Sequence, residues 1–282
     1  MNSPDADRGL TDVETHFAFG RNWASFVSEL DDAQVERAIR GLGRLVAPDE
    51  IEGKTFLDIG CGSGLSMLAA LRLGAGSVTG VDIDDASVQT AQQLLEQRAP
   101  EIREKWSTSV ASVFDLDPEV DGTFDVVHSW GVLHHTGDMA RAIETAARLV
   151  APGGLYVLAL YQKTRYCDLW RKEKRFYTSA PPVAQAMVRA LYKSAYLAGV
   201  AVTRRNPVTY VREYGSDRGM DFNHDVHDWL GGYPYESVDP VALQADLASL
   251  GFEPSRTFIV PVRRGLLGTR CDEYVVRRRV TQ

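Results

Sequence analysis

Short apolar runs alternate with amphipathic stretches along most of this chain, and glycine, proline or polar residues separate them. Buried strands are predicted by apolar runs at 56–59, 77–82, 109–115, 124–129, 155–161, 257–262 and 272–279. Helices are predicted after residue 64, between the fourth and fifth strands, and at 32–46, 183–197 and 238–250. Strands that alternate with helices are typical of an α/β fold.

The turn after the first strand carries glycine at every second position, at Gly60, Gly62 and Gly64. Glycine has no Cβ, so a ligand can lie directly against this backbone. The helix that begins near Gly64 directs unpaired N–H groups at such a ligand and favours a carboxylate or phosphate. A dinucleotide-binding fingerprint would need its third glycine at position 65, which is Leu65. The spacing therefore indicates a nucleotide-like ligand of another kind.

An acidic residue, Asp82, ends the second strand 18 positions after Gly64. A carboxylate at this place can accept hydrogen bonds from both ribose hydroxyls of a nucleotide. The glycine turn preceded by Asp58, this acidic residue and the later strands in their order resemble the motif series of the class I S-adenosylmethionine (SAM)-dependent methyltransferases. The resemblance covers residues 54–161 and is closest to the small-molecule branch related to the ubiquinone-pathway O-methyltransferases.

The resemblance implies a Rossmann-like, seven-stranded, mostly parallel sheet with an antiparallel C-terminal edge hairpin and a helical insertion between strands 5 and 6. It also implies SAM as the cofactor and S-adenosylhomocysteine (SAH) as its product. Ile83 is then expected against the adenine face, and residues 112–114 at the adenine edge, although the family often has Asp where Ser112 stands. The residues assigned to the cofactor are Asp58, Gly60, Cys61, Gly62, Gly64, Asp82, Ile83, Ser112, Val113, Phe114 and Ser129.

Methyl transfer is an in-line displacement, so the site mainly has to hold the acceptor close and aligned in a dry pocket. A hydroxyl acceptor must also lose its proton, and histidine is the usual general base near neutral pH. His134 and His135 follow the fourth strand, at the carboxyl end of the sheet. We predict that one of them is the base, with a slight preference for His134. The alternative is a base from the insertion, His224 or His227.

The acceptor is less well defined by the sequence. Residues 129–131 read Ser-Trp-Gly where the Asn/Asp-Pro-Pro-Tyr signature of amide and adenine N-methyltransferases would stand. A hydroxyl oxygen on a small molecule is therefore the first choice, and a nitrogen or carbon atom the second. RNA methylation through a basic insertion and a SAM-binding role without catalysis are the remaining alternatives. No oligomeric state is predicted.

Composition limits the cellular compartments and the classes of binding partner that we expect for this protein. The formal net charge of the 282 residues is −7, which argues against nucleic acid as the main partner. The three cysteines have neither disulfide nor metal-binding spacing, and Cys61 is expected to be a small packed residue. The chain shows no signal peptide and no long uncharged apolar run. We therefore predict a cytoplasmic protein with no transmembrane segment and no bound metal.

The charge is unevenly distributed. Between Lys163 and Arg212 there are eleven Lys and Arg and two acids, a formal charge of +9 that leaves −16 for the remainder of the chain. Within this segment, the helix predicted at 183–197 places Val183, Met187 and Leu191 near one face. Three roles are open: a lid whose apolar side covers the site, a basic collar for an anionic substrate, and an interfacial helix that takes a lipid-like substrate from a membrane surface.

Two further segments are expected to shape the acceptor pocket. The aromatic arm at 15–26 resembles arms that fold over the SAM pocket, with Asn22 and Trp23 as its contacts. The polar and aromatic segment 218–235 is expected to be a substrate-shaping loop. A purely structural role is the alternative for both, and the histidine and aspartate spacing in 224–228 does not match a zinc site. The residues assigned to the acceptor are Asn22, Trp23, Trp130, His224, His227 and Trp229.

These expectations divide the chain into four parts. Residues 1–48 are the arm and leading helix, and 49–161 form the SAM-binding core. Residues 162–236 form the helical and loop insertion, and 237–282 complete the core with a helix and a strand pair.

Overall fold

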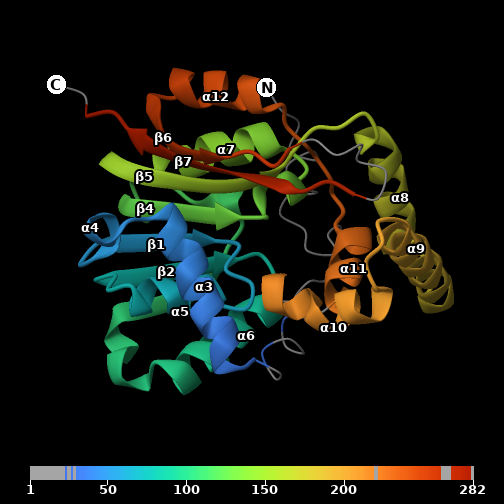
Figure 1. Ribbon diagram of the computed structural model, residues 1–282. Coiled ribbons are helices and arrows are strands. Elements are labelled where there is room, and N and C mark those ends of the chain that lie inside the picture. The colour runs from blue at the N-terminus through green and yellow to red at the C-terminus, as the bar shows by residue number, and fades with distance from the viewer. Residues whose placement is uncertain (1–22, 24–26, 28–29, 219–221, 262–267, 281–282) are drawn as a thin grey trace.

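The computed structural model describes residues 23, 27, 30–218, 222–261 and 268–280. Its centre is a seven-stranded sheet in the order β3-β2-β1-β4-β5-β7-β6, shown in Figure 1. The strands are β1 (Thr55–Ile59), β2 (Ser77–Asp82), β3 (Trp106–Val110), β4 (Phe124–Trp130), β5 (Val150–Tyr161), β6 (Phe252–Phe258) and β7 (Cys271–Arg278). Neighbours among β1 to β5 are parallel, and β7 runs antiparallel to both β5 and β6. The sheet predicted from the sequence is confirmed.

Both faces of the sheet are covered, so its central strands are nearly continuous apolar runs. In β1, Phe56 packs into the cluster under one layer of helices, while Leu57 and Ile59 pack into the cluster under the other. The first layer contains α3 (Asp32–Leu45), α5 (Leu65–Arg72) and α6 (Asp85–Arg98), and the second contains α7 (Met139–Arg148) and α12 (Pro240–Ser249). Shorter elements are α4 (Pro48–Ile51) and the 3-10 turns η2 (Pro100–Lys105), η3 (Val113–Asp115) and η4 (Leu133–His135).

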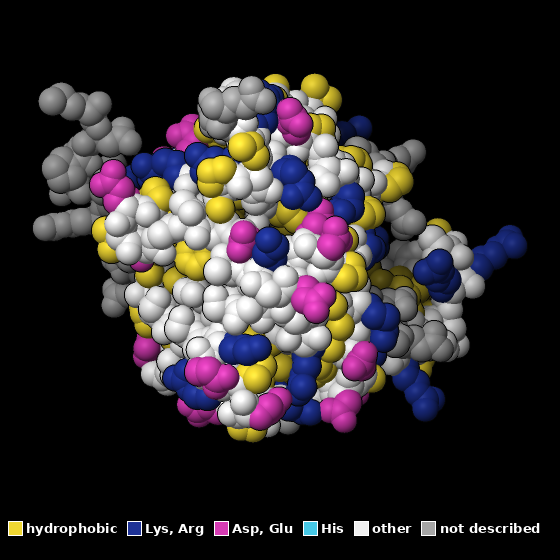
Figure 2. Space-filling view, turned by 90° about the vertical axis from the view of Figure 1, so that its left-hand side faces the viewer, with side chains coloured by type: hydrophobic (Ala, Val, Ile, Leu, Met, Phe, Trp, Pro, Cys, Tyr) yellow, Lys and Arg dark blue, Asp and Glu magenta, His cyan; other side chains and the backbone are white. Residues whose placement is uncertain are grey.

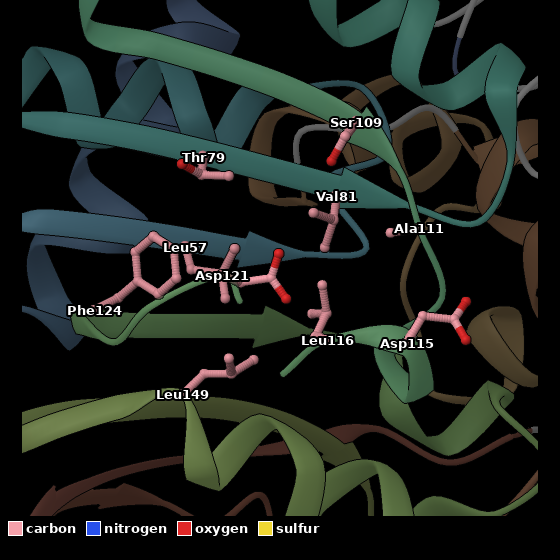
Figure 3. A pocket seen from close by; sticks show the side chains of 10 residues that line it. All are labelled: Leu57, Thr79, Val81, Ser109, Ala111, Asp115, Leu116, Asp121, Phe124 and Leu149. Atoms are coloured by element: carbon pink, nitrogen blue, oxygen red, sulfur yellow. The ribbon is translucent and has the colours of Figure 1, made fainter. Parts of the chain in front are cut away.

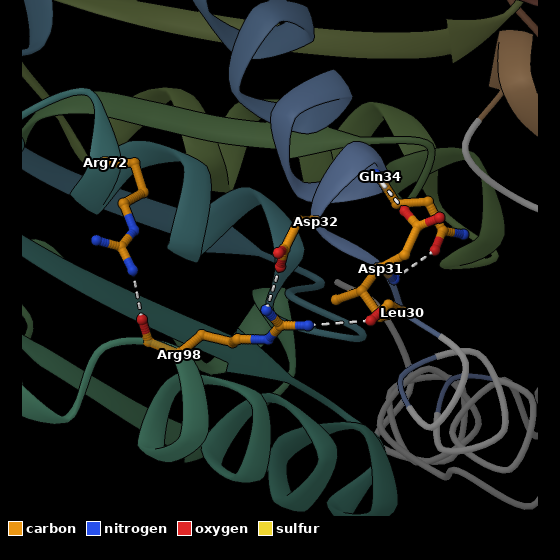
Figure 4. Close-up of polar contacts among 6 residues, drawn as sticks. All are labelled: Leu30, Asp31, Asp32, Gln34, Arg72 and Arg98. Carbon is orange, nitrogen blue, oxygen red and sulfur yellow. Dashed lines mark hydrogen bonds and ion pairs between the residues drawn. The ribbon is translucent and has the colours of Figure 1, made fainter.

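The leading helix α3 begins at a capping box, drawn in Figure 4. The Asp31 carboxylate accepts from the N–H of Gln34 at 2.7 Å, and the Gln34 side chain accepts from the N–H of Asp31 at 2.8 Å. Arg98 at the end of α6 then binds this helix start, because its guanidinium donates to the Asp32 carboxylate at 2.6 Å and to the Leu30 carbonyl at 3.0 Å. These contacts fix the leading helix on the sheet next to α6.

The insertion between β5 and β6 consists of four helices at one end of the molecule (Figure 1). They are α8 (Cys167–Ser179), α9 (Pro182–Val202), α10 (Pro207–Arg218) and α11 (Phe222–Gly231). They share an aromatic core of their own, which includes Trp170, Tyr177, Tyr214, Phe222 and Tyr235.

Three predictions about single elements are wrong. The segment 218–235 is not a connecting loop, because 222–231 forms α11 with Phe222, Val226 and Leu230 buried at helical spacing. The third strand ends at Val110 and does not continue to residue 115. Strand β6 lies at 252–258, earlier than the run predicted at 257–262.

The exterior carries charges of both signs on the face turned to the viewer in Figure 2. Lys, Arg, Asp and Glu side chains are interspersed there with scattered apolar ones. Within the described part of the chain, none of the helices has the length and apolar character needed to cross a membrane.

Candidate active site at the carboxyl edge of the sheet

The turn that follows β1 is held by its backbone against β2. The N–H groups of Gly60 and Cys61 both donate to the carbonyl oxygen of Val81, at 2.8 and 3.0 Å. Gly60 has a φ of +73°, and a Cβ there would come within 2.4 Å of the Val132 side chain. Glycine is required, because any side chain would be strained by this φ and would collide with the segment after β4. The turn thus joins the ends of β1, β2 and β4.

Asp82 ends β2 and binds the same turn. Its carboxylate accepts from the N–H of Gly62 at 2.9 Å and from the N–H of Asp84 at 3.0 Å. Burial raises the pKa of this carboxyl to about 6, against the opposing effect of those two hydrogen bonds. Each carboxylate oxygen has a second lone pair, so ribose hydroxyls can still donate to it. Ile83, the next residue, is partly exposed at this edge.

The segment after β3 lies beside Asp82. The N–H of Ala111 donates to the carbonyl oxygen of Asp82 at 2.9 Å. Ser112 then caps η3, with its Oγ accepting from the N–H of Phe114 at 3.4 Å. Ser112 and Val113 are buried and Phe114 is partly exposed. The three residues assigned to the adenine edge are therefore next to the residue assigned to the ribose.

Three residues assigned to the cofactor are inside the protein. Asp58 is 2% exposed, and its carboxylate lies 2.7 Å from Nδ1 of His128 on β4. Ser129 is fully buried and donates to the carbonyl oxygen of Ile59 at 3.0 Å. Cys61 is also buried, which raises the pKa of its thiol, as do the nearby carboxylates. These side chains join β1 to β4 beneath the site. His128 was missed from the sequence, because it stands in an apolar strand with no motif of its own.

Trp23 of the N-terminal arm covers the glycine turn. A Cβ on Gly62 would lie 3.1 Å from the indole Nε1 of Trp23. This contact is the one that an arm folded over the cofactor pocket would make. Asn22 lies outside the described residues.

His134, on η4, is fully buried behind Tyr161. Its ring centroid is 3.9 Å from that of Tyr161, and its Nδ1 accepts from the Tyr161 N–H at 3.4 Å. Its Nε2 has no hydrogen-bond partner among the described residues. Burial lowers the pKa of His134 well below its ordinary value, and the neighbouring His135 and Lys174 act in the same direction. The neutral, enclosed ring does not favour His134 as the base.

His135 is only partly buried. Its Nδ1 lies 2.7 Å from the carbonyl oxygen of Pro234, which can only accept, so Nδ1 carries the proton. In the neutral ring, Nε2 therefore holds the lone pair that a general base needs. The ring also packs against Gly232, where a Cβ would come within 2.6 Å of His135 Cε1. The segment after α11 thus orients this histidine.

The remaining residues assigned to the acceptor are placed differently. Trp229 on α11 packs edge-on against Tyr161 at a centroid distance of 5.5 Å, and Tyr161 in turn packs against both histidines. His227 faces into the insertion, where its Nδ1 is 2.7 Å from the Tyr177 hydroxyl. Trp130 is half exposed and donates to the Glu273 carboxylate at 3.0 Å. His224 belongs to α11, and its side chain lies outside the described part of the structure.

Lys174 is an unpredicted member of this region. It is fully buried, with Nζ 3.7 Å from the ring centroid of Trp229 and 5.3 Å from that of Tyr235. Its sequence context, a lysine among other charges on a helix, is typical of a solvated face. Among the residues with described placements, no group of three or more His, Cys, Asp and Glu could hold a metal ion.

A separate pocket lies on one face of the sheet, shown in Figure 3. Its walls come from β1, β2, β3 and the segments around η3 and β4. The residues that line it are Leu57, Thr79, Val81, Ser109, Ala111, Asp115, Leu116, Asp121, Phe124 and Leu149. None of the residues assigned to cofactor or acceptor is among them. The pocket adjoins the candidate site through Val81 and Ala111, whose backbones bind the glycine turn and Asp82.

Comparison with known proteins identifies the class. Residues 57–156 match the family model of the methyltransferase domain. The ubiquinone biosynthesis O-methyltransferase of Caulobacter sp. (strain K31) is 36% identical over 140 residues, which cover 50% of this chain and 51% of that protein. The ribosomal protein L11 methyltransferase of Thermotoga petrophila is 42% identical over 78 residues, 28% of this chain and 27% of that protein. Magnesium protoporphyrin IX methyltransferase (ChlM) of Synechocystis PCC 6803, solved with bound SAH, has a TM-score of 0.52 and 17% identity, covering 87% of this chain and 84% of that one.

The chain contains a class I SAM-dependent methyltransferase domain, as its motif series predicts. It is distantly homologous to the ubiquinone O-methyltransferases and to the L11 methyltransferase. The matches span about half of the first of these relatives and about a quarter of the second. The likeness to ChlM extends over most of both chains and shows the shared fold.

Proposed function

We propose that this protein is a SAM-dependent methyltransferase that transfers a methyl group to a hydroxyl oxygen of a small-molecule acceptor. The observation that carries the proposal is the convergence of two parts at one edge of the sheet. The glycine turn with Asp82 supplies a nucleoside-binding cradle, and Val132, which packs on Gly60, leads within three residues to His135.

In this proposal the cofactor lies along the carboxyl ends of β1, β2 and β3. Asp82 holds the ribose, Ile83 and residues 112–114 contact the adenine, and Trp23 closes the pocket over the glycine turn. The bound SAM supplies an electrophilic methyl group. The chain's own part is to bind, align and enclose the two reactants, which is where most of the rate enhancement of such a displacement originates.

His135 is the general base that we propose, in preference to His134. The Pro234 carbonyl fixes the proton on Nδ1, so Nε2 can accept the proton of the acceptor hydroxyl. His134 is enclosed by Tyr161, and its burial leaves no path for such a transfer. Its role is then to support the turn that carries His135. Tyr161 and Trp229 form the aromatic wall beside these histidines.

Methyl-labelled SAM tests the proposed reaction. The full chain is incubated with extracts from cells that lack it, and the label is followed into aqueous small molecules, organic-soluble lipids and macromolecules. The expected result is label in a small-molecule or lipid fraction, as an O-methyl group in the isolated product. Label found only in RNA or protein would contradict the proposal, as would an N- or C-methyl product. SAM binding without any labelled product would indicate a non-catalytic role.

Substitution of each histidine tests the base. Once the labelled product identifies an acceptor, His135→Asn is expected to lower kcat by roughly 10²- to 10⁴-fold while SAH affinity stays unchanged. It should also remove the acidic limb from the pH–rate profile. His134→Asn is the matched control and is expected to act mainly on stability. Unchanged turnover in His135→Asn together with a loss in His227→Asn would move the base into the insertion.

A further inference from the structure

The outer face of α9 is an uncharged apolar surface. Figure 1 shows this helix at the end of the molecule farthest from α3 and α4. Four of its large apolar side chains are open to solvent: Val183 is 72% exposed, Met187 68%, Leu191 75% and Val202 84%. The other exposed positions within the helix are Pro182, Ala186, Ala190, Ser194, Ala195, Ala198 and Ala201. A helix of 21 residues is about 30 Å long, so this stripe is extensive.

The charges of α9 are turned away from this face. Arg189 donates to the Tyr177 hydroxyl at 2.6 Å, and Lys193 donates to the Asn223 side chain at 2.6 Å. Both residues therefore point at the neighbouring helices of the insertion. The opposite side of α9, with Tyr192 and Tyr196, packs into the aromatic core of the insertion. One face of the helix is thus packed against the protein, and the apolar stripe on the other face is exposed to solvent.

The exposure of this face bears on the lid considered for the segment. A lid would turn its apolar side toward the site, but Val183, Met187 and Leu191 face solvent. Exposed apolar surface of this extent on a folded domain marks a contact with another apolar phase.

Basic residues precede and follow the stripe in the chain. On α8, the preceding helix, Lys172, Arg175 and Phe176 are exposed. Arg204 and Arg205 directly follow α9 and are also exposed. Residues 163–212 carry a formal charge of +9. An apolar stripe between clusters of cations is complementary to an anionic lipid surface, where acyl chains receive the apolar side chains and headgroups bind the cations.

We propose that the outer face of α9 docks on an anionic lipid bilayer, with Met187 and Leu191 at the acyl boundary and the flanking arginines and lysines at the headgroups. A second copy of this chain is disfavoured as the occupant, because the exposed arginines that follow each stripe would then be brought together with those of the other copy. Nucleic acid is disfavoured as well, because phosphates would leave the apolar stripe uncovered. The proposal does not depend on the methyltransferase activity.

Vesicle flotation with the full chain tests this docking. Binding is expected to vesicles of phosphatidylcholine mixed with phosphatidylglycerol and to be at least roughly tenfold weaker with phosphatidylcholine alone. The double variant Met187→Gln, Leu191→Gln should weaken binding to the mixed vesicles by about tenfold or more. Arg204→Glu, Arg205→Glu should do the same and reduce the salt dependence. Both pairs are exposed, so the fold should not change.

Val241→Gln is the matched control. Val241 is an exposed apolar residue on α12, on a different side of the molecule, and its replacement should leave vesicle binding unchanged. The proposal is overturned if the unaltered chain does not bind the mixed vesicles at low salt, or if the Met187 and Leu191 variant binds as well as the control. It is also overturned if the chain is a dimer that this double variant converts to monomer, since a second copy would then occupy the face.

Discussion

At the scale of single residues, the candidate site depends on a carboxylate whose ionisation is poised near neutral pH. Burial raises the pKa of Asp82 from 3.8 to about 6. In the protein without ligand, the folded state therefore holds a proton on Asp82 over a range where the unfolded chain has lost it. The contribution of this group to stability is present at low pH and is lost as the pH rises through about 6.

Ligand binding should have the opposite pH dependence. Ribose hydroxyls donate to the ionised carboxylate, so SAH should bind more tightly as the pH rises through about 6 and should displace a proton below it. Calorimetry in buffers of different ionisation enthalpy measures both effects. Asp82→Asn should lose the proton release, and Asp82→Ala should weaken SAH binding by roughly 10- to 100-fold. An SAH affinity in Asp82→Ala equal to that of the unaltered chain would remove Asp82 from the cofactor site.

At the scale of elements, the packing of α5 against α6 requires a glycine at the helix start. Gly64 caps α5 with a φ of +77°, and a Cβ on it would lie 2.8 Å from the backbone Cα of Ala91 on α6. Gly122 has a similar φ of +79° with nothing within 4 Å of its Cβ position. The two glycines share the conformational requirement but differ in the space around them.

Their alanine variants should separate strain from crowding. Gly122→Ala is expected to lower the free energy of unfolding by about 1 kcal/mol, from the left-handed conformation alone. Gly64→Ala should cost about 3 kcal/mol, because the two helices must also move apart. Urea denaturation of both variants measures the difference. Equal losses would mean that α5 and α6 adjust freely, and that the turn is not held by their contact.

The start of α3 offers a second test of an element. Asp31→Ala removes the side chain that accepts from the Gln34 N–H and should cost about 1 kcal/mol of unfolding free energy. Asp31→Asn keeps a capping oxygen and is the matched control, expected to remain close to the unaltered chain. Denaturant unfolding checks both. If the Asn variant loses as much as the Ala variant, the charge rather than the cap stabilises this helix.

The helices and strands of the core could be predicted because the apolar pattern of each segment agrees with its buried place in the fold. Strand β2 was predicted at residues 77–82 and lies there, since a buried apolar run ends at a polar residue that caps it. The α11 segment was mistaken for a loop because its two neighbouring His-Asp pairs obscure the spacing of Phe222, Val226 and Leu230. Likewise, Ser112 reads as strand, but its hydroxyl accepts from the Phe114 N–H and turns the chain.

At the scale of the whole molecule, the sequence predicts the cofactor side of the candidate site better than the aromatic side that the insertion contributes. Gly60 and Asp82 belong to one contiguous motif, so their spacing carries the information. Trp229 lies on α11, Lys174 on α8 and Tyr235 in the segment after α11, and only the fold brings them toward Tyr161. The orientation of α9 could not be predicted from the sequence either. Helical periodicity places the apolar residues on one face, but it does not tell whether that face is turned to the protein or to solvent.

Lys174 is a buried charge inside the insertion. It occupies the buried face of α8 together with Cys167, Trp170 and Tyr177, where an apolar residue would be expected. Its ammonium group lies over the Trp229 ring and has no hydrogen-bond partner among the described residues. The groups that act on it electrostatically are Glu173, Asp228 and His134. Burial lowers its pKa below the ordinary value of 10.5, and the two carboxylates only partly oppose this.

Lys174→Met should therefore stabilise the protein, and by an amount that depends on pH. The folded chain releases the Lys174 proton at about pH 7 and the unfolded chain at about 10.5, so the stability of the unaltered protein rises with pH between these two values. Methionine has no such dependence. Burial raises the pKa of Glu173 to about 7, so this carboxyl can take up a proton once the ammonium is absent. The variant should be more stable by about 1 kcal/mol at neutral pH, with the gap narrowing as the pH rises. Urea unfolding over a pH series measures it, with Lys172→Met on the exposed side of α8 as the control. A destabilised Lys174→Met with a constant gap would show that the ammonium is paired in the folded protein, and that the insertion needs this charge to close on the core.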